Sequence, residues 1–405
     1  MLKDKTVLLG VTGSIAAYKA ASLASLLVKN HADVHVLMTK NATNIINPIA
    51  FETLTGNKCL IDTFDRNFEF DVKHVSLAKK ADIFVVAPAT ANVIAKIASG
   101  ICDDMLTTTF LASECPKMIS PAMNTRMLMN PITQSNIERC RSFGMKIIDS
   151  AEGHLACGDD GKGKMPEPEV IFNYIASEIA FGKDLKGKRI LVTAGPTRER
   201  LDPVRFLSNR STGKMGFAVA RVAAMRGADV TLVSGPVSLE TPLSVRRIDV
   251  ESADEMFRAV SDAFDSCDIV IKAAAVADYK PAVYVDEKIK KTEEKSGVPC
   301  IELSRTEDIL ASLGARKKGQ FLCGFSMETQ DMIENSRRKL EKKNLDMIVA
   351  NNLKVSGAGF GTDTNVVTII TKDGEKELPI MTKEQVASAL LDEILLSLKS
   401  GMSGN

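Results

Sequence analysis

A single cysteine lies in a stretch that is too polar and too rich in glycine to be core. The stretch is "HLACGDDGKGKM", residues 154–165, and the cysteine is Cys157. A thiol in such a place can be a metal ligand, a redox group or a proton donor. The eight cysteines include no C-x-x-C pair and the four histidines are dispersed, which argues against a zinc site. A disulfide framework is also unexpected in a chain of this size and composition.

In the first half of the chain, polar residues follow the predicted strands. A strand over Val7–Val11 is followed by the turn Thr12-Gly13-Ser14 and a helix from about Ile15 to Asn30. The backbone amides at the start of such a helix suit an anion. Alternatively, Gly13 only allows a tight turn before a capped helix. Because ligands of open α/β sheets bind at the carboxyl ends of strands, we expect a phosphate-bearing planar cofactor there. The other polar strand ends are at Thr39, Thr90 and Asn92.

The second half contains two candidate phosphate loops. Gly195-Pro196-Thr197 follows a predicted strand, and Ser211-Thr212-Gly213-Lys214 precedes a helix predicted from about Phe217. The second loop is not a P-loop, because it lacks the first glycine and has Met215 where Ser or Thr would bind magnesium. The polar segment 196–214 is long enough to suggest a functional loop. Neither half has a G-x-G-x-x-G motif, which argues against an NAD(P)-dependent oxidoreductase.

The strands and helices that must position these residues occur in two sets. "KTVLLGVTGS" (5–14) is similar to "KRILVTAGPT" (188–197), and "ADVHVLMT" (32–39) to "ADVTLVSG" (228–235). Buried-type strands that alternate with helical segments predict α/β domains with parallel sheets. The linker is the polar segment 180–189, so we expect two Rossmann-like domains, 1–187 and 188–405.

Composition excludes several classes of protein. The 405 residues are too many for one ordinary core, and 45% apolar with 25% charged residues is typical of a soluble protein. A net charge of +1 gives no reason to expect nucleic acid or a membrane surface as a partner. The longest apolar region, residues 83–98, is interrupted by Pro88, Asn92 and Lys96, so it does not predict a membrane span. We therefore expect a cytoplasmic protein.

Several motifs of the first half resemble the flavin-dependent cysteine decarboxylases, which have a flavodoxin-like fold. They are "TGSIAAYK" (12–19), "KHVSLAKKAD" (73–82), "APATAN" (87–92), "PAMN" (121–124) and "ACGD" (156–159). The second half resembles phosphopantothenoylcysteine synthetases in "TAGPTRE" (193–199), "DPVRFLSNRSTGKMG" (202–216), "AAAVADY" (273–279), "KIKK" (288–291) and "KLEKKNLDMIVAN" (339–351). In this order the motifs resemble the fused bifunctional proteins of coenzyme A biosynthesis. One departure is Leu128, where many bacterial members carry Trp.

For the first domain, the resemblance implies FMN-dependent decarboxylation of 4′-phospho-N-pantothenoylcysteine. Oxidation of the substrate thiol to a thioaldehyde makes the carboxylate a leaving group, and the flavin supplies that oxidation. His74 would be the base or the stabiliser at the oxidation step, and Asn124 would hold the carboxylate. Cys157 would return a proton, since a thiol of pKa about 8.5 is mostly protonated at neutral pH. From the residues alone, His74 could also be a surface or capping histidine. The implied FMN contacts are Gly13, Ser14, Ile15, Thr39, Thr90 and Asn92.

For the second domain, the resemblance implies ligation of 4′-phosphopantothenate to cysteine. The carboxylate would be activated as an acyl-nucleotide, with CTP as the expected co-substrate and Mg²⁺ as its partner. Asn209 would orient the acyl phosphate, and Lys288 would neutralise charge on it, although from composition Lys288 could be only a solvated lysine. No metal ligands are predicted. The implied nucleotide contacts are Gly195, Thr197, Ala273, Ala274, Ala275, Asp278, Lys288, Thr306, Asp308, Ile309, Phe325, Lys339 and Lys343.

The resemblance also implies a homo-oligomer, with a trimer-based decarboxylase and a dimeric ligase. Its partners would be small molecules: 4′-phosphopantothenate, cysteine, CTP and phosphopantothenoylcysteine. Spacing alone leaves open the choice between CTP and ATP and the effect of Leu128 on substrate preference. One alternative is a flavoprotein that serves as a regulatory, binding subunit without turnover. The presence of His74, Asn124 and Cys157 together argues against it.

Overall fold

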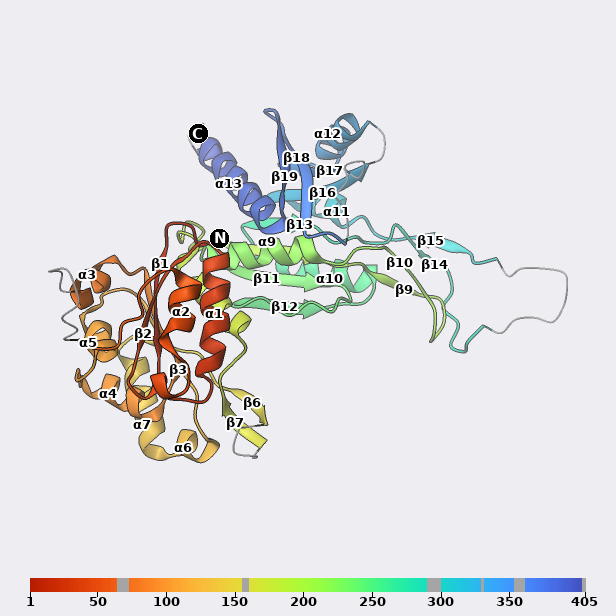
Figure 1. Ribbon diagram of the computed structural model, residues 1–405. Coiled ribbons are helices and arrows are strands. Elements are labelled where there is room, and N and C mark those ends of the chain that lie inside the picture. Colours follow the sequence, from red (N-terminus) through yellow and green to blue (C-terminus); the bar gives the residue numbers. More distant parts are fainter. Residues whose placement is uncertain (64–72, 155–159, 290–299, 329–330, 353–360, 403–405) are drawn as a thin grey trace. The chain divides into compact units, whose positions relative to one another are not determined.

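The computed structural model describes residues 1–63, 73–154, 160–289, 300–328, 331–352 and 361–402. The chain divides into two compact units, which we call unit 1 (Met1–Gly182) and unit 2 (Lys183–Asn405). The division falls within the polar segment 180–189. In Figure 1, unit 1 runs from red to yellow-green and unit 2 from green to blue, and each unit has its own central sheet.

Unit 1 is built on a five-stranded parallel sheet with the strand order β2-β1-β3-β4-β5. All residues of strands β1 and β3 are buried, as expected for parallel strands that are covered on both faces. This strand order is that of flavodoxin-like folds, so the predicted fold type of the first half is confirmed. The strands are β1 (Thr6–Val11), β2 (Asp33–Met38), β3 (Ile83–Ala89), β4 (Lys117–Pro121) and β5 (Lys146–Ile147).

Helices cover both faces of this sheet (Figure 1). Alternate residues of β1 point to opposite faces, so that Val7 and Leu9 pack with α1, α2 and α8, whereas Leu8 packs with α4, α5 and α7. The helices are α1 (Ala17–Lys29), α2 (Pro48–Thr55), α3 (Lys73–Lys80), α4 (Ala91–Ser99), α5 (Met105–Ala112), α6 (Thr125–Met129), α7 (Pro131–Ser142) and α8 (Pro168–Ile179), with a 3₁₀ turn at Ala42–Asn44. Helix α1 begins two residues later than the sequence predicted.

A separate antiparallel hairpin extends from unit 1. It consists of β6 (Ala151–His154) and β7 (Asp160–Lys164), with His154 paired to Asp160. Residues 155–159, and with them Cys157, lie outside the described residues.

Unit 2 has an eight-stranded sheet with the order β12-β11-β8-β13-β16-β17-β18-β19. The first six strands are parallel and the last two are antiparallel additions. Numbered along the chain, the parallel strands have the order 3-2-1-4-5-6, so the predicted Rossmann-like fold is confirmed. The parallel strands are β8 (Arg189–Ala194), β11 (Asp229–Ser234), β12 (Val245–Asp249), β13 (Ile269–Lys272), β16 (Phe321–Glu328) and β17 (Met347–Asn352), and the antiparallel strands are β18 (Thr364–Thr371) and β19 (Glu375–Thr382).

Among its described residues, unit 2 also has two short ribbons and five helices. Strand β9 (Arg198–Arg200) pairs with β10 (Phe206–Ser208), and β14 (Tyr279–Pro281) pairs with β15 (Leu303–Arg305). The helices are α9 (Lys214–Met225), α10 (Ala253–Phe264), α11 (Ile309–Arg316), α12 (Met332–Lys342) and α13 (Lys383–Met402). Among the described residues, no helix combines the length and the apolar character that a membrane span requires.

Helix α9 starts at Lys214, three residues before the start near Phe217 that the sequence predicted. Gly213 precedes it with a φ of 78°, a conformation that favours glycine. A Cβ on Gly216 would lie 2.6 Å from the Cβ of Ala194. The helix therefore lies directly against the end of β8, and the predicted loop 211–214 includes its first residue.

Candidate functional site

A cavity of about 730 Å³ opens at the carboxyl edge of the unit 1 sheet. Its walls are formed by the segments that follow β1, β2, β3 and β4 and by the end of β7. Its size is in the range of cofactor-binding pockets. All six residues predicted to bind the cofactor line it, namely Gly13, Ser14, Ile15, Thr39, Thr90 and Asn92, and so does Asn124.

The turns that follow β1 and β3 are joined by one buried hydroxyl. Thr12 Oγ1 donates to the carbonyl of Pro88 at 2.8 Å and accepts from the amide of Thr90 at 3.0 Å. A Cβ on Gly13 would lie 2.7 Å from the Cβ of Asn41, so the turn needs a residue without a side chain. Ala16 is the N-cap residue of α1 and has no side chain that could cap the helix, and its amide donates to Ser14 Oγ at 3.4 Å. This helix start therefore suits an anion.

Thr39 supplies an independent sign that a ligand occupies the cavity. Thr39 lines the cavity, and its buried Oγ1 has no hydrogen-bond partner among the described residues. A buried hydroxyl without a partner costs about 1–3 kcal/mol. A polar group of a bound ligand would remove that cost.

Asn124 occupies the N-cap of α6, where its Oδ1 accepts from the amide of Arg126 at 2.8 Å. The β6–β7 hairpin docks on the same turn: the Met123 amide donates to the Gly163 carbonyl at 3.1 Å. Thr125 Oγ1 donates to the Lys162 carbonyl at 2.7 Å. Because the strands of this hairpin flank residues 155–159, it connects the Asn124 turn with the segment of Cys157.

Only part of the predicted catalytic set can be placed. His74 lies in the first turn of α3, and Cys157 lies outside the described residues, so their approach to the cavity stays a prediction. Leu128 is buried in the core cluster that includes α4 and α5, next to Met127, which lines the cavity.

Five charged residues of the cavity wall were not identified from the sequence: Lys19, Lys40, Lys96, Asp104 and Lys164. Lys19 is buried, and its Nζ lies 2.7 Å from Glu167 Oε1 and 3.4 Å from the Met165 carbonyl. Lys96 follows Asn92 by four residues on α4, a spacing that places both on one face of the helix and could have drawn attention to it.

A second candidate site lies at the carboxyl ends of β8 and β13 in unit 2. These neighbouring strands mark the point where the strand order reverses, which is where open α/β sheets bind ligands. Gly195 has a φ of 76°, its carbonyl accepts from the Ala275 amide at 2.9 Å, and Asn209 Nδ2 donates to the Ala275 carbonyl at 3.0 Å. Thr197 Oγ1 accepts from the amide of Ala277 at 3.0 Å. The structure thus brings Gly195, Thr197, Asn209 and Ala273–Ala275 together.

The remaining predicted nucleotide contacts lie on several different elements of unit 2. The Thr306 amide donates to the Asp278 carbonyl at 3.1 Å, and Lys343 Nζ lies 2.8 Å from Asp308 Oδ2. Asp308 also caps α11, where it accepts from Ala311, whereas the next residue, Ile309, is buried in the core. Lys343 lies one residue beyond the end of α12. The structure places Phe325 on β16 and Lys339 within α12.

Lys288 stands apart from this group on the exposed segment that follows β14. The next residue, Ile289, donates its amide to Asp202 Oδ2 at 3.2 Å, and its carbonyl accepts from Arg205 at 2.8 Å. The hydrogen bonds from Arg205 hold the pKa of Asp202 below its ordinary value. The segment of Lys288 is thus fixed to the loop 196–214, which also carries Asn209.

Lys272, the last residue of β13, was not identified from the sequence. Burial, together with repulsion from Lys343, lowers its pKa to about 8, while Asp308 and Asp278 act in the opposite direction. A charged residue at the end of the apolar run "DIVIK" is the signal that could have revealed it. Within the described residues, no group of three or more His, Cys, Asp or Glu side chains could hold a metal ion.

The chain is similar to known proteins over almost its whole length. The family model "Flavoprotein" matches residues 1–180, and "DNA/pantothenate metabolism flavoprotein C-terminal domain" matches residues 185–397. The coenzyme A biosynthesis bifunctional protein CoaBC of Bacillus subtilis (strain 168) is 49% identical over 398 residues, 97% of each chain. CoaBC of Escherichia coli (strain K12) is 42% identical over 395 residues, again 97% of each chain. A solved C-terminal domain of CoaBC is 47% identical and covers 54% of this chain and 100% of its own, with a TM-score of 0.47.

Gly163 is the position at which the hairpin depends on having no side chain. A Cβ there would collide with the carbonyl oxygen of Met123, and the φ of 134° disfavours other residues. We expect Gly163→Ala to separate the hairpin from the Asn124 turn, so that the Met123 amide exchanges its hydrogen at least tenfold faster, a loss of about 1.4 kcal/mol of local stability. Hydrogen exchange read by mass spectrometry measures this. Gly182→Ala is the control, because a Cβ at Gly182 meets no atom within 4 Å; equal exchange in both variants would contradict the docking.

Proposed function

The chain belongs to the family of bifunctional coenzyme A biosynthesis proteins, with phosphopantothenoylcysteine decarboxylase and phosphopantothenate–cysteine ligase activities, and we propose that unit 1 performs the first with FMN and unit 2 the second with CTP. The two steps are consecutive, since the product of the ligase is the substrate of the decarboxylase. The division of labour is supported by the match of each family model to one unit.

The main support for FMN-dependent decarboxylation in unit 1 is that the six residues predicted to contact FMN all line one cavity. The residues present fit a flavin nucleotide: the starts of α1 and α4 suit its phosphate, and the unpartnered Thr39 hydroxyl suits a polar group of the ligand. Apolar side chains such as Val93 and Met123 suit a planar ring. When bound, FMN supplies the two-electron oxidation and reduction that decarboxylation of a cysteine carboxylate requires.

The side chains of unit 1 then divide the remaining work. Asn124 would hold the substrate carboxylate through Nδ2, because only the nitrogen of an amide side chain can donate, while its Oδ1 accepts from the Arg126 amide. His74 would accept the thiol proton, a task for which an imidazole is suited near neutral pH. Cys157 would return a proton to the decarboxylated carbon. The strands that flank residues 155–159 in the chain dock beside Asn124.

In unit 2, the turns after β8 and β13 would hold the nucleotide at the point where the strand order reverses. Lys343 and Lys272 supply positive charge beside Asp308 for the triphosphate, and Lys288 with Asn209 would stabilise the activated acyl group. Magnesium would be held mainly by phosphate oxygens, because the described residues offer no acidic cluster for it.

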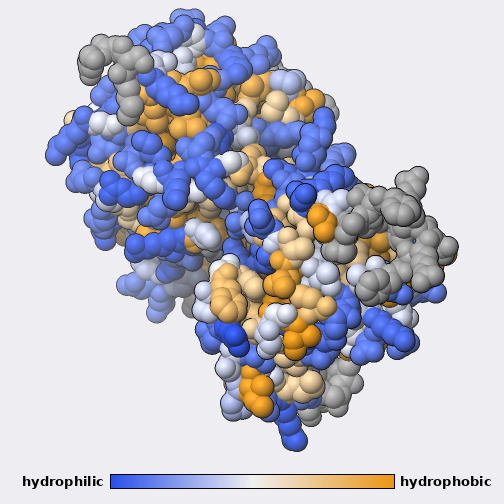
Figure 2. All heavy atoms as spheres, turned by 90° about the vertical axis from the view of Figure 1, so that its left-hand side faces the viewer, coloured by the Kyte–Doolittle hydropathy of each residue, from blue (hydrophilic) through white to orange (hydrophobic). Residues whose placement is uncertain are grey.

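We also propose a cytoplasmic homo-oligomer. Figure 2 shows hydrophobic residues gathered in clusters on one face of the molecule, among mainly hydrophilic residues. Such clusters often mark subunit interfaces. The large apolar residues exposed in unit 1 include Ile15, Tyr18, Ile49, Met127, Met129 and Ile132.

The assignment of unit 1 is tested with the purified full chain. We expect it to retain a yellow flavin and to release one CO₂ for each 4′-phospho-N-pantothenoylcysteine consumed. Asn124→Ala should lower the rate at least a hundredfold with the flavin retained, because the carboxylate loses its amide donor. Yellow wild-type protein that releases no CO₂ would instead favour a binding subunit.

The nucleotide of unit 2 is tested by isothermal titration of the full chain with CTP, ATP and UTP. We expect CTP to bind at least tenfold more tightly than the other two, a difference of about 1.4 kcal/mol. Equal or tighter binding of ATP would overturn the choice of CTP.

The role of Lys288 separates the two activities. We expect Lys288→Gln to lower amide formation at least a hundredfold, since an activated acyl phosphate loses the cation that neutralises it, and to leave CO₂ release unchanged. Lys318→Gln is the control, because Lys318 is also exposed in unit 2 but lies just before the start of β16, at the amino ends of the parallel strands, whereas the predicted site is at their carboxyl ends. Loss of both activities in Lys288→Gln would indicate misfolding and contradict this role.

A further inference from the structure

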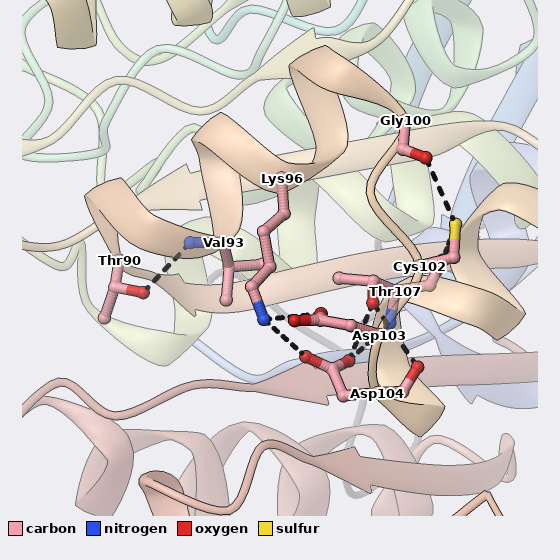
Figure 3. Close-up of polar contacts among 8 residues, drawn as sticks. All are labelled: Thr90, Val93, Lys96, Gly100, Cys102, Asp103, Asp104 and Thr107. Carbon is pink, nitrogen blue, oxygen red and sulfur yellow. Dashed lines mark hydrogen bonds and ion pairs between the residues drawn. The ribbon is translucent and has the colours of Figure 1, made fainter.

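Three charged side chains form an ion-pair cluster at the wall of the unit 1 cavity (Figure 3). Lys96 Nζ lies 2.6 Å from Asp103 Oδ1 and 3.2 Å from Asp104 Oδ2. Lys96 and Asp104 line the cavity and are only 20% and 22% exposed, whereas Asp103 is 59% exposed and is not among the lining residues. The two carboxylates therefore share one cation, but only one of them faces the cavity.

Local structure holds Asp104 in a single orientation. Helix α4 ends at Gly100, whose φ of 70° reverses the chain, and α5 begins after Asp104. Asp104 Oδ1 accepts from the amide and the hydroxyl of Thr107, at 2.8 and 2.9 Å, while Oδ2 faces Lys96. Each carboxylate oxygen thus has its own partner, so the carboxylate is rigid (Figure 3).

Lys96 remains charged in this setting. Burial alone would lower its pKa, but its hydrogen bonds to Asp103 and Asp104 outweigh burial and raise the pKa above the ordinary value. The cluster consequently carries one positive and two negative charges at neutral pH, a net charge of about −1.

The wall of the cavity contains two groups of residues with different electrostatic character, and Lys19, Lys40 and Lys164 also line it. The starts of α1 and α4, with Ser14, Thr90 and Asn92, offer amides and the positive ends of two helix dipoles. Lys96 lies one helical turn further along α4 than Asn92, next to the carboxylate of Asp104. A phosphate dianion is attracted to the first group and repelled by the carboxylates of the second. The unpartnered Thr39 hydroxyl in the same cavity indicates that a polar ligand fills it.

We propose that Lys96 and Asp104 are positioning residues for the ring end of the flavin, and that their opposite charges set how readily the bound flavin accepts electrons. This inference rests on the proposed function of unit 1. A flavin gains negative charge when it is reduced, so Asp104 disfavours the reduced form and Lys96 favours it. Asp103 forms an ion pair with Lys96 but does not line the cavity.

The test measures the midpoint potential of FMN bound to the full chain in three variants. Lys96→Met keeps the methylene stem but removes the cation, so the potential should become more negative. Asp104→Asn keeps an N-cap acceptor for Thr107 but removes the carboxylate charge, so the potential should become more positive. Each change should alter the ratio of the dissociation constants of oxidised and reduced FMN by roughly tenfold, the effect of one charge in a partly screened pocket. Asp103→Asn is the matched control and should give a smaller shift than Asp104→Asn.

Shifts of the midpoint potential that have the same sign in Lys96→Met and Asp104→Asn would overturn the proposal. Such a result would mean that both substitutions act by loosening the turn between α4 and α5, and not through their charges. Equal shifts in Asp103→Asn and Asp104→Asn would overturn it as well. Asp104→Ser, whose hydroxyl can cap α5 in place of the carboxylate, replaces Asp104→Asn if that variant fails to fold.

Binding of riboflavin, which lacks the phosphate, identifies the end of the flavin that Lys96 faces. We expect Lys96→Met to weaken FMN and riboflavin by the same factor, whereas Ser14→Asp should weaken FMN alone. Loss of FMN affinity alone in Lys96→Met would place Lys96 at the phosphate and overturn the proposal. Wild-type protein that binds neither flavin would instead overturn the proposed function itself, and this inference with it.

Discussion

Parallel strands bring their carboxyl ends to one edge of a sheet, and in both units a threonine hydroxyl holds two of these ends together. In unit 1, Thr12 after β1 bonds to Pro88 and Thr90 of the β3 end. In unit 2, Thr193 at the end of β8 accepts from Ala274, and Thr197 accepts from Ala277, both after β13. Each pair of strands flanks the point where the strand order reverses. A buried hydroxyl can donate and accept at once, so it fixes both turns without a larger side chain that would fill the crevice.

The charged residues around the unit 1 cavity are held in pairs that join separate parts of the chain. Lys19 of α1 meets Glu167 just before α8, and Lys96 of α4 meets Asp104 at the start of α5. A charge in a poorly solvated wall is costly unless it is compensated, and a compensated charge is also fixed in direction. These pairs give the cavity rigid walls with a defined electrostatic pattern, which a ligand of mixed character such as a flavin nucleotide can use.

In unit 2, Lys288 is the lysine expected to neutralise charge on the acyl phosphate. It lies far along the chain from Gly195 and Thr197, which are expected to bind the nucleotide. Asp202 and Arg205 attach the segment that follows β14 to the loop 196–214 by bonds to the backbone of Ile289. The same loop presents Asn209 to Ala275. One long loop thus connects the segment of Lys288 with the crevice at the end of β13, which accounts for its length and polarity.

The sequence by itself determined the two α/β sheets and most of the cavity's turn residues. Continuous apolar runs such as β1 and β3 can be covered only on both faces, and the positive φ of Gly195 is a local demand of its turn, whereas Gly13 is required by the approach of Asn41. Tertiary structure alone decided which charges lie in the cavity wall. Lys96 and Asp104 look like ordinary surface residues in the sequence, and Lys19 and Glu167 are 148 residues apart. Such pairs are set by helix packing and chain reversal at Gly100, and these depend on contacts between distant residues that no local pattern records.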